Sequence, residues 1–121
     1  MYSCSHGETF NCPIEIAEAR YGLEVAYKQL NHSNEGHGLH NGGKGLSQAY
    51  RVRGKALLSA GYSRTRQPVW GLNGGEMGGT NGFTIVRNDG SHSGHAFVSG
   101  VELDAGDMLL IHTANGGGWG K

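Results

Sequence analysis

The sequence has few of the residues that build a large hydrophobic core. Only 36% of its 121 residues are hydrophobic and 8% are aromatic, whereas 23 residues are glycine, against a usual glycine share of about 7%. Glycine loses more backbone freedom on folding than any other residue. The chain therefore has a large entropic cost of folding and little apolar area to offset it. We expect it to fold on, or together with, something larger.

The sequence also lacks an excess of charge, a long apolar run and a cysteine framework. Ten basic and ten acidic residues cancel, which argues against nucleic acid and anionic membranes as partners. The longest aliphatic run, residues 108–111, is far too short to span a bilayer. The first residues lack the apolar segment of a signal peptide. The two cysteines, Cys4 and Cys12, are therefore expected to be reduced thiols in the cytoplasm.

Short segments in which apolar and polar residues alternate predict a mainly β fold. Residues 13–20 favour a strand by the same alternation, with a short helix beginning at Pro13 as the alternative. We expect a loose lead-in over residues 1–12 and one domain over residues 13–120, a small barrel-like arrangement of short strands with little helix. The other strands are expected within residues 23–28, on both sides of Gly54, within 83–87 before the turn at Asn88-Asp89-Gly90, within 95–103 and within 108–113.

Glycines recur with a regular spacing in the loops between these strands. Residues 71–82 contain three consecutive G-x-x-G units. Polyproline II has three residues per turn, so each unit places its glycines on one edge, where another backbone can approach closely. We therefore predict polyproline II-like segments packed edge to edge, with the intervening side chains pointing away. The glycines expected at these contacts are Gly71, Gly74, Gly75, Gly78, Gly79 and Gly82.

A phosphate-binding loop is the alternative for the glycine-rich stretches. Such loops follow a strand, precede a helix and usually carry a lysine. Residues 71–82 precede an expected strand and contain no lysine, whereas the loop over residues 31–45 contains Lys44. The pattern favours packed segments in the first stretch and leaves the second open.

Several stretches together resemble the C-terminal region of the hydantoinase B/oxoprolinase family. The stretches ARYGL, EGHGLHNGGKGL, SRTRQPVWGLNGG and LDAGDMLLIHTANGGGWG occur in the order that the family has. Their shared order and spacing cover nearly the whole chain. The chain departs from the family pattern at Asn41 and Glu76, where the family often has basic residues, and at Asn115, where it often has glycine.

The resemblance implies ATP-dependent chemistry in a hetero-oligomer. Hydantoinase-A-like large subunits would bind ATP and Mg²⁺ and phosphorylate the substrate, and hydantoinase-B-like large subunits would host the carboxylation or hydrolysis that follows. Because family subunits are several times longer, the chain is expected to be a separate small subunit of an acetophenone carboxylase-type ketone carboxylase. It would bind no cofactor and would not be catalytic alone. The alternatives are a part of a cyclic-amide hydrolase of the N-methylhydantoinase or 5-oxoprolinase type, and a stand-alone β scaffold.

The sequence identifies no catalytic residue, but it offers a few candidates for binding. Arg64 and Arg66, together with Lys44, are candidates for binding a carboxylate or phosphate. Ion pairs across a subunit interface are the alternative for the two arginines. Trp70 and Trp119 are expected to anchor an interface or the core.

Seven histidines raise the question of a metal site. His37 and His40, and likewise His92 and His95, have a spacing that two ligands could use. Both pairs lie in expected polar loops, and zinc needs four convergent ligands, or three and a water. We expect solvated histidines and no metal, with a metal site as the alternative. The N-terminal residues Cys4, His6 and Cys12 match no known ligand spacing.

Overall fold

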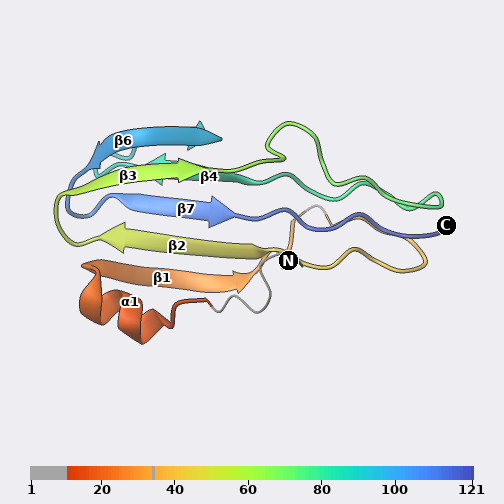
Figure 1. Cartoon of the computed structure of the whole chain (residues 1–121), viewed down its shortest axis with the longest axis horizontal. Helices are drawn as coiled ribbons and strands as arrows, with labels where there is room; N and C mark the ends of the chain where they lie inside the picture. The colour runs from red at the N-terminus through yellow and green to blue at the C-terminus, as the bar shows by residue number, and fades with distance from the viewer. Residues whose placement is uncertain (1–10, 34) are drawn as a thin grey trace.

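The computed structural model of the chain describes residues 11–33 and 35–121. These residues form two antiparallel sheets, one with five strands in the order β1-β2-β7-β4-β5 and one with the two strands β3 and β6 (Figure 1). The predicted mainly β fold is confirmed, although the two sheets stay open and do not close into a barrel. The elements are α1 Ile14–Arg20, β1 Leu23–Leu30, β2 Leu46–Val52, β3 Ala56–Gly61, β4 Gly82–Val86, β5 His92–His95, β6 Phe97–Leu103 and β7 Met108–His112.

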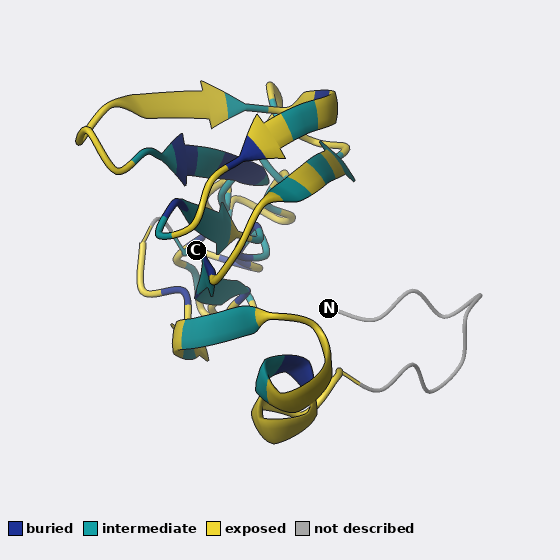
Figure 2. Cartoon of the chain, turned by 90° about the vertical axis from the view of Figure 1, so that its left-hand side faces the viewer, coloured by how far each residue is buried: buried dark blue, intermediate teal, exposed yellow. Residues whose placement is uncertain are grey.

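The strand expected over residues 13–20 is wrong, because these residues form the helix α1 after Pro13. Proline suits the start of a helix, since its φ of −58° is already fixed near the helical value. The N–H of Ala17 donates to the carbonyl of Pro13 at 3.0 Å. Ala17 is the buried residue of the helix, whereas Ile14 and Ile16 are exposed. Figure 2 shows the helix as mostly exposed, with one buried stretch. The alternation of Ile14 and Ile16 in the sequence therefore does not indicate a strand with one buried face.

The core lies where the two-stranded sheet packs on the five-stranded sheet. Val52 of β2, Ile85 of β4 and Leu103 of β6 form a buried cluster, and Leu58 and Val101 of the smaller sheet pack against it. The cluster is small, as the low hydrophobic content predicts. The other face of the smaller sheet carries two exposed large side chains, Leu57 and Phe97.

A buried carboxylate joins the turns at one end of the larger sheet. Asp107 is 2% exposed and accepts hydrogen bonds from the Arg87 guanidinium at 2.8 Å and from the N–H groups of Asn88 and Asp104, both at 3.0 Å. These bonds, first that from the N–H of Asp104, hold the pKa of Asp107 below its ordinary value. The Asp107 carboxylate thus holds together the turn after β4 and the turn before β7.

Replacing Asp107 with asparagine is expected to destabilise the chain by about 2 kcal/mol at neutral pH, since hydrogen bonds to a charged group contribute about 1.5–3 kcal/mol. Because the folded pKa is lowered, this contribution is complete above the unfolded value of about 3.9 and is lost as the pH falls through the folded pKa. Urea unfolding at pH 7 and at pH 3 measures it, and the gap between wild type and variant should narrow at pH 3. The control is Asp104→Asn, because Asp104 is exposed and contacts Asp107 through its backbone N–H, which the substitution leaves in place. A gap that stays constant with pH would contradict the prediction.

The glycine-rich segments form an arm that extends away from the sheets, with the C-terminus at its tip (Figure 1). The arm comprises residues 36–43, 69–79 and 115–120. Residues 69–79 turn back at Asn73 and Gly74, where φ is positive, so they form one limb with Leu72 and a second limb with Glu76. Three consecutive N–H groups near the C-terminus donate to these two limbs and to residues 36–43. The bonds run from Gly118 to the carbonyl of Glu76 at 2.9 Å, from Trp119 to that of His40 at 2.8 Å and from Gly120 to that of Leu72 at 3.0 Å.

This pattern has a period of three, which is the period of a polyproline II helix and not of a strand. A strand sends successive hydrogen bonds to two opposite sides. The C-terminal segment of the arm instead has three neighbours around it, as the three directions of its N–H groups require. The arm is therefore a bundle of extended segments and not a third sheet.

The interior of the arm is backbone. A Cβ atom added to Gly78 would overlap the carbonyl of Asn115, one added to Gly75 that of Gly118, and one added to Gly71 that of Gly75. This is the packing that the edge-to-edge hypothesis predicts. This packing favours the packed-segment hypothesis over a phosphate loop for residues 71–82. In the other stretch Gly42 is packed against Gly116, but a Cβ at Gly43, beside Lys44, would meet nothing within 4 Å, so the alternative stays open there.

Some of the expected glycines have other roles. Gly74 has a φ of +85°, and a Cβ there would meet the side chain of Lys121 at 2.6 Å, not backbone. A Cβ at Gly82 would meet the ring of His112 at 2.9 Å. Gly79 donates its N–H to the carbonyl of Asn115 at 3.1 Å. The expectation that Asn81 points away is wrong, because its side chain bonds to backbone on both sides of it.

Candidate functional site

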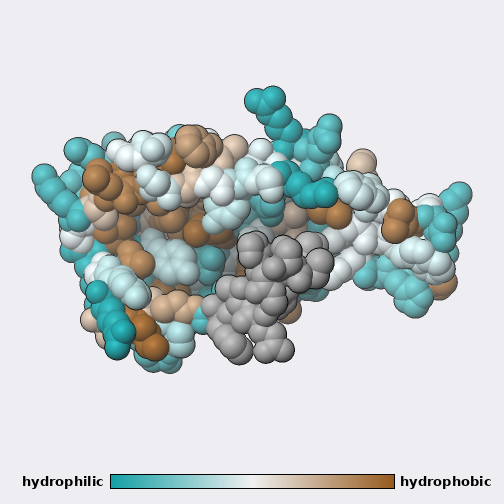
Figure 3. Space-filling view, viewed as in Figure 1, coloured by the Kyte–Doolittle hydropathy of each residue, from teal (hydrophilic) through white to brown (hydrophobic). Residues whose placement is uncertain are grey.

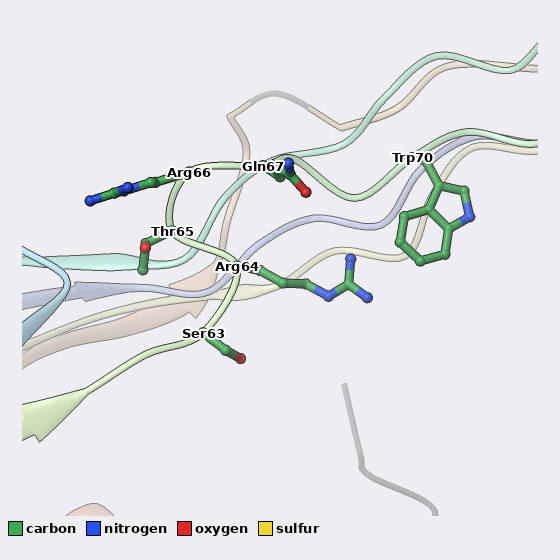
Figure 4. A pocket seen from close by; sticks show the side chains of 6 residues that line it. All are labelled: Ser63, Arg64, Thr65, Arg66, Gln67 and Trp70. Carbon is green, nitrogen blue, oxygen red and sulfur yellow. The ribbon is translucent and has the colours of Figure 1, made fainter.

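The candidate site is a hollow in the loop between β3 and the arm, built around a stacked arginine. The Arg64 guanidinium lies over the ring of Trp70, with 4.7 Å between its central carbon and the ring centroid (Figure 4). A planar guanidinium stacked on an indole is held in place while the N–H groups at its edge remain available. The hollow has a volume of about 550 Å³ and is lined by Ser63, Arg64, Thr65, Arg66, Gln67 and Trp70.

The backbone at Arg64 is held in an unusual conformation. Its φ of +53° lies in the left-handed region, which is uncommon for a residue with a side chain and costs of order 1 kcal/mol or more. Asn81 holds this bend twice, because its N–H donates to the carbonyl of Arg64 at 3.0 Å and its side-chain amide donates to the carbonyl of Ser63 at 2.8 Å. The conformation is therefore imposed by neighbours, and it directs Arg64 toward Trp70.

The three predicted cations do not converge. Arg66 lines the same hollow, but its side chain points to the side opposite to Arg64 (Figure 4). Lys44 forms an ion pair with Glu35 at 2.8 Å, and this contact lowers the pKa of Glu35. Within residues 11–33 and 35–121, Arg64 forms no ion pair. The arginine best placed to receive an anion is therefore Arg64.

Sequence reasoning missed the polar junction, a group of buried or half-buried side chains between the sheet and the arm. Its members are Asn31, Asn81, Thr113 and Asn115. Asn115 is fully buried, and its side chain accepts from the N–H of Gly45 at 2.7 Å and donates to the carbonyl of Ser33. The carbonyl of Thr113 accepts from the Asn31 amide at 2.9 Å. These amides supply the hydrogen bonds that the backbone lacks where the strands end.

In the part of the chain that the structure describes, no three histidine, cysteine, aspartate or glutamate side chains cluster, so neither histidine pair has a third ligand beside it there. The absence of a metal stays a prediction. The His40 ring contacts Trp119 in a tilted arrangement, with 5.6 Å between the ring centroids, and His95 stacks on Phe83 at 5.8 Å. The expectation that His92 and His95 lie in a loop is wrong, because they begin and end β5.

The remaining candidates have the following positions. Trp70 is 59% and Trp119 44% exposed, so neither tryptophan anchors the core. Cys12 is free and exposed, whereas Cys4, His6 and the lead-in up to residue 10 lie outside the described residues. In the described ranges no helix has the length and the apolar character needed to cross a membrane.

Comparisons with known proteins point to one family. A profile described as Hydantoinase B/oxoprolinase matches residues 2–121. The chain is 30% identical over 111 residues to an uncharacterized protein of Methanocaldococcus jannaschii. The aligned region covers 92% of this chain and 20% of that protein. The chain is 32% identical over 107 residues to 5-oxoprolinase 1 of Arabidopsis thaliana, covering 88% of this chain and 8% of that protein.

A fungal relative extends this similarity. The chain is 28% identical over 118 residues to 5-oxoprolinase PfmaA of Pestalotiopsis fici, covering 93% of this chain and 9% of that protein. The chain thus spans a fifth or less of the length of these curated relatives. No solved structure matches it.

Proposed function

The chain belongs to the hydantoinase B/oxoprolinase family, and we propose that it forms part of an ATP-dependent enzyme that opens a cyclic amide of the 5-oxoproline type. The relatives named 5-oxoprolinases support this choice of substrate class. In the proposed reaction the amide C–N bond breaks, and one water supplies a hydroxyl group to the carbonyl carbon and a proton to the nitrogen. A second water is consumed as ATP is converted to ADP and phosphate. The product is an open-chain amino acid.

The observation that carries the proposed role of this chain is the stacked Arg64. A substrate such as 5-oxoproline bears a carboxylate, and an arginine edge matches two carboxylate oxygens. The Trp70 ring fixes the guanidinium before the anion arrives, so little side-chain entropy is lost on binding. The hydroxyl groups of Ser63 and Thr65 line the same hollow. This chain would bind and orient the substrate, and partner subunits would supply the reacting groups.

We propose that this chain itself binds neither ATP nor Mg²⁺, and two features of the described residues support this. Its helix α1 follows Pro13 and not a glycine loop, and its glycine segments are filled by each other's backbone. We therefore propose that hydantoinase-A-like and hydantoinase-B-like large subunits bind the nucleotide and complete a hetero-oligomer with this chain. A cytoplasmic location and the absence of nucleic acid or membrane partners stay predictions from the sequence.

Changing Arg64 to glutamine is expected to raise the KM for 5-oxoproline about tenfold or more, because a charge-assisted bidentate contact is lost. The matched control is Arg66→Gln. It removes the same charge only two residues further along the chain, from a side chain that points to the opposite side. We expect the control to change KM less than about threefold. The assay follows 5-oxoproline consumption and ADP release by the chain assembled with the large subunits of its own genome. Equal effects of the two variants would contradict the proposed role.

The same assembly distinguishes the reaction classes. ATP-dependent loss of 5-oxoproline without bicarbonate supports the hydrolase. ATP consumption that requires both bicarbonate and a ketone, with no turnover of cyclic amides, would replace it by the ketone carboxylase expected from the resemblance. A stable chain that joins no larger polypeptide and turns over neither substrate would leave the scaffold alternative.

A further inference from the structure

The arm reverses the usual arrangement of a folded segment. Backbone fills its interior, so its large apolar side chains have only the outside to occupy. Apolar surface gathers at several points along it in Figure 3. These side chains and their exposed fractions are Leu39 67%, Trp70 59%, Leu72 57%, Met77 63% and Trp119 44%.

The exposed side chains near the tip are neighbours and not scattered single residues. The N–H of Leu39 donates to the carbonyl of Gly120, next to Trp119. Leu72 and His40 both form backbone bridges with Trp119, and the His40 ring packs at a tilt against the indole. Three different segments thus place apolar groups around one end of the arm. Several large apolar side chains exposed on adjacent segments are typical of an interaction site.

The arm is also stiff enough to serve as a docking element. Its segments are joined by hydrogen bonds in three directions, and the contacts between them leave no room for a methyl group. A preformed surface loses little conformational entropy when it binds. Exposed tryptophan, leucine and methionine on such a surface are the residue types that gain most from being buried by a partner.

We propose that the arm inserts its apolar side chains into an apolar groove of a larger polypeptide of the same family. The lengths of the relatives favour this occupant. In the archaeal relative the matched segment is 20% of the protein, so four-fifths of that protein lie outside it and are available to cover the same surface. The inference deepens the partner named in the proposed function, but it depends on the family and on the arm and not on the ring-opening reaction.

The test measures binding of the full chain to a tagged hydantoinase-B-family polypeptide from the same genome, without ATP or substrate. Leu39→Glu, Leu72→Glu and Met77→Glu place a charge on the arm. Leu57→Glu and Phe97→Glu are matched controls, because these side chains are equally exposed, at 72% and 73%, on the two-stranded sheet. All five positions are exposed, so the far-ultraviolet circular dichroism should stay that of wild type.

We expect each arm variant to raise the dissociation constant at least about tenfold, the effect of losing an interface hot spot, and each control to change it less than about threefold. Loss of binding in the controls alone, or equal behaviour of all five variants, would overturn the proposal. Sedimentation of the chain alone identifies the other occupant: a dimer that the arm variants dissociate would assign the arm to a second copy. Because no substrate is present, intact binding without ring opening overturns the proposed reaction and leaves the docking role standing.

Discussion

Alanine at Gly42 is expected to disrupt the arm, whereas alanine at Gly43, the next residue, is expected to be tolerated. A Cβ at Gly42 would overlap the carbonyl group of Gly116, which belongs to the backbone of the neighbouring segment. A Cβ at Gly43 would meet nothing within 4 Å. The two substitutions are chemically identical and differ only in the direction in which the new methyl group points.

The expected costs differ in sign. Overpacking against side chains already costs about 1–3 kcal/mol, and backbone gives way less than a side chain does, so we expect about 3 kcal/mol or more for Gly42→Ala. Gly43→Ala restricts the unfolded chain without strain and should be neutral or stabilising by up to about 1 kcal/mol. A loss of about 3 kcal/mol is a large part of the stability of a small domain.

Thermal unfolding of each variant, with the partner polypeptide present where the chain alone aggregates, measures the difference. Gly75→Ala and Gly78→Ala should behave like Gly42→Ala, because their methyl groups would also meet backbone carbonyls. Glu76→Ala and Thr80→Ala, within the same stretch, should be mild. A flat profile across these positions, or equal melting temperatures for the Gly42 and Gly43 variants, would reject the packed bundle.

Removing the side chain of Asn115 is expected to destabilise the chain by about 2–4 kcal/mol, because unpaired buried polar groups cost about 1–3 kcal/mol each. Asn115→Ala leaves two backbone groups without their partner, the N–H of Gly45 and the carbonyl of Ser33. Asn115→Gly, which introduces the residue that the family often has at this position, loses the same two bonds and should cost as much.

Urea unfolding gives this free energy directly. The control is Asn41→Ala, because Asn41 is exposed and accepts one long hydrogen bond of 3.3 Å from the N–H of Gly38. Its removal should cost less than about 1 kcal/mol, as exposed substitutions do. If Asn115→Gly unfolds at the same urea concentration as wild type, water replaces the side chain and the junction is not held by this amide.

Four of the five strands of the larger sheet were predictable from apolar residues that alternate or run together, whereas β5 was not, because His92–His95 contains no apolar residue. Alternation at Leu23, Val25 and Tyr27 marks β1, and the Asn88-Asp89-Gly90 turn marks the end of β4. Strand order was not predictable, because β7 pairs with β2 and β4, both distant in sequence. The period of a segment reports which face it buries and contains no information on its neighbour.

The arm was half predictable. The G-x-x-G spacing indicates a period of three and close backbone contact, which residues 71–79 have. The partners of those contacts lie some forty residues away on both sides, so spacing within one segment could not identify them. Gly74 shows the limit of the rule, because it serves a turn with positive φ although it has the spacing of a packed glycine.

The polar residues were the least predictable part. Asn31 and Asn115 lie in glycine-rich sequence that is typical of solvated loops, yet both are buried, because the ends of strands carry N–H and carbonyl groups that need partners. An asparagine close to a strand end and to a glycine run is the sequence signal that could have indicated this buried role. For Arg64 and Arg66 the sequence indicates the right loop, but only the left-handed backbone of Arg64 decides which of the two faces Trp70.

The backbone interior of the arm has a thermal consequence. Exposing apolar surface raises the heat capacity on unfolding, whereas exposing amide groups lowers it. Melting the arm releases mainly amides into water, so the arm adds little to the heat capacity change or even reduces it, and its enthalpy of melting changes little with temperature. Apolar burial loses strength on cooling, but hydrogen-bonded backbone does not depend on it. The arm therefore keeps its shape in the cold, where the small core between the two sheets is weakest.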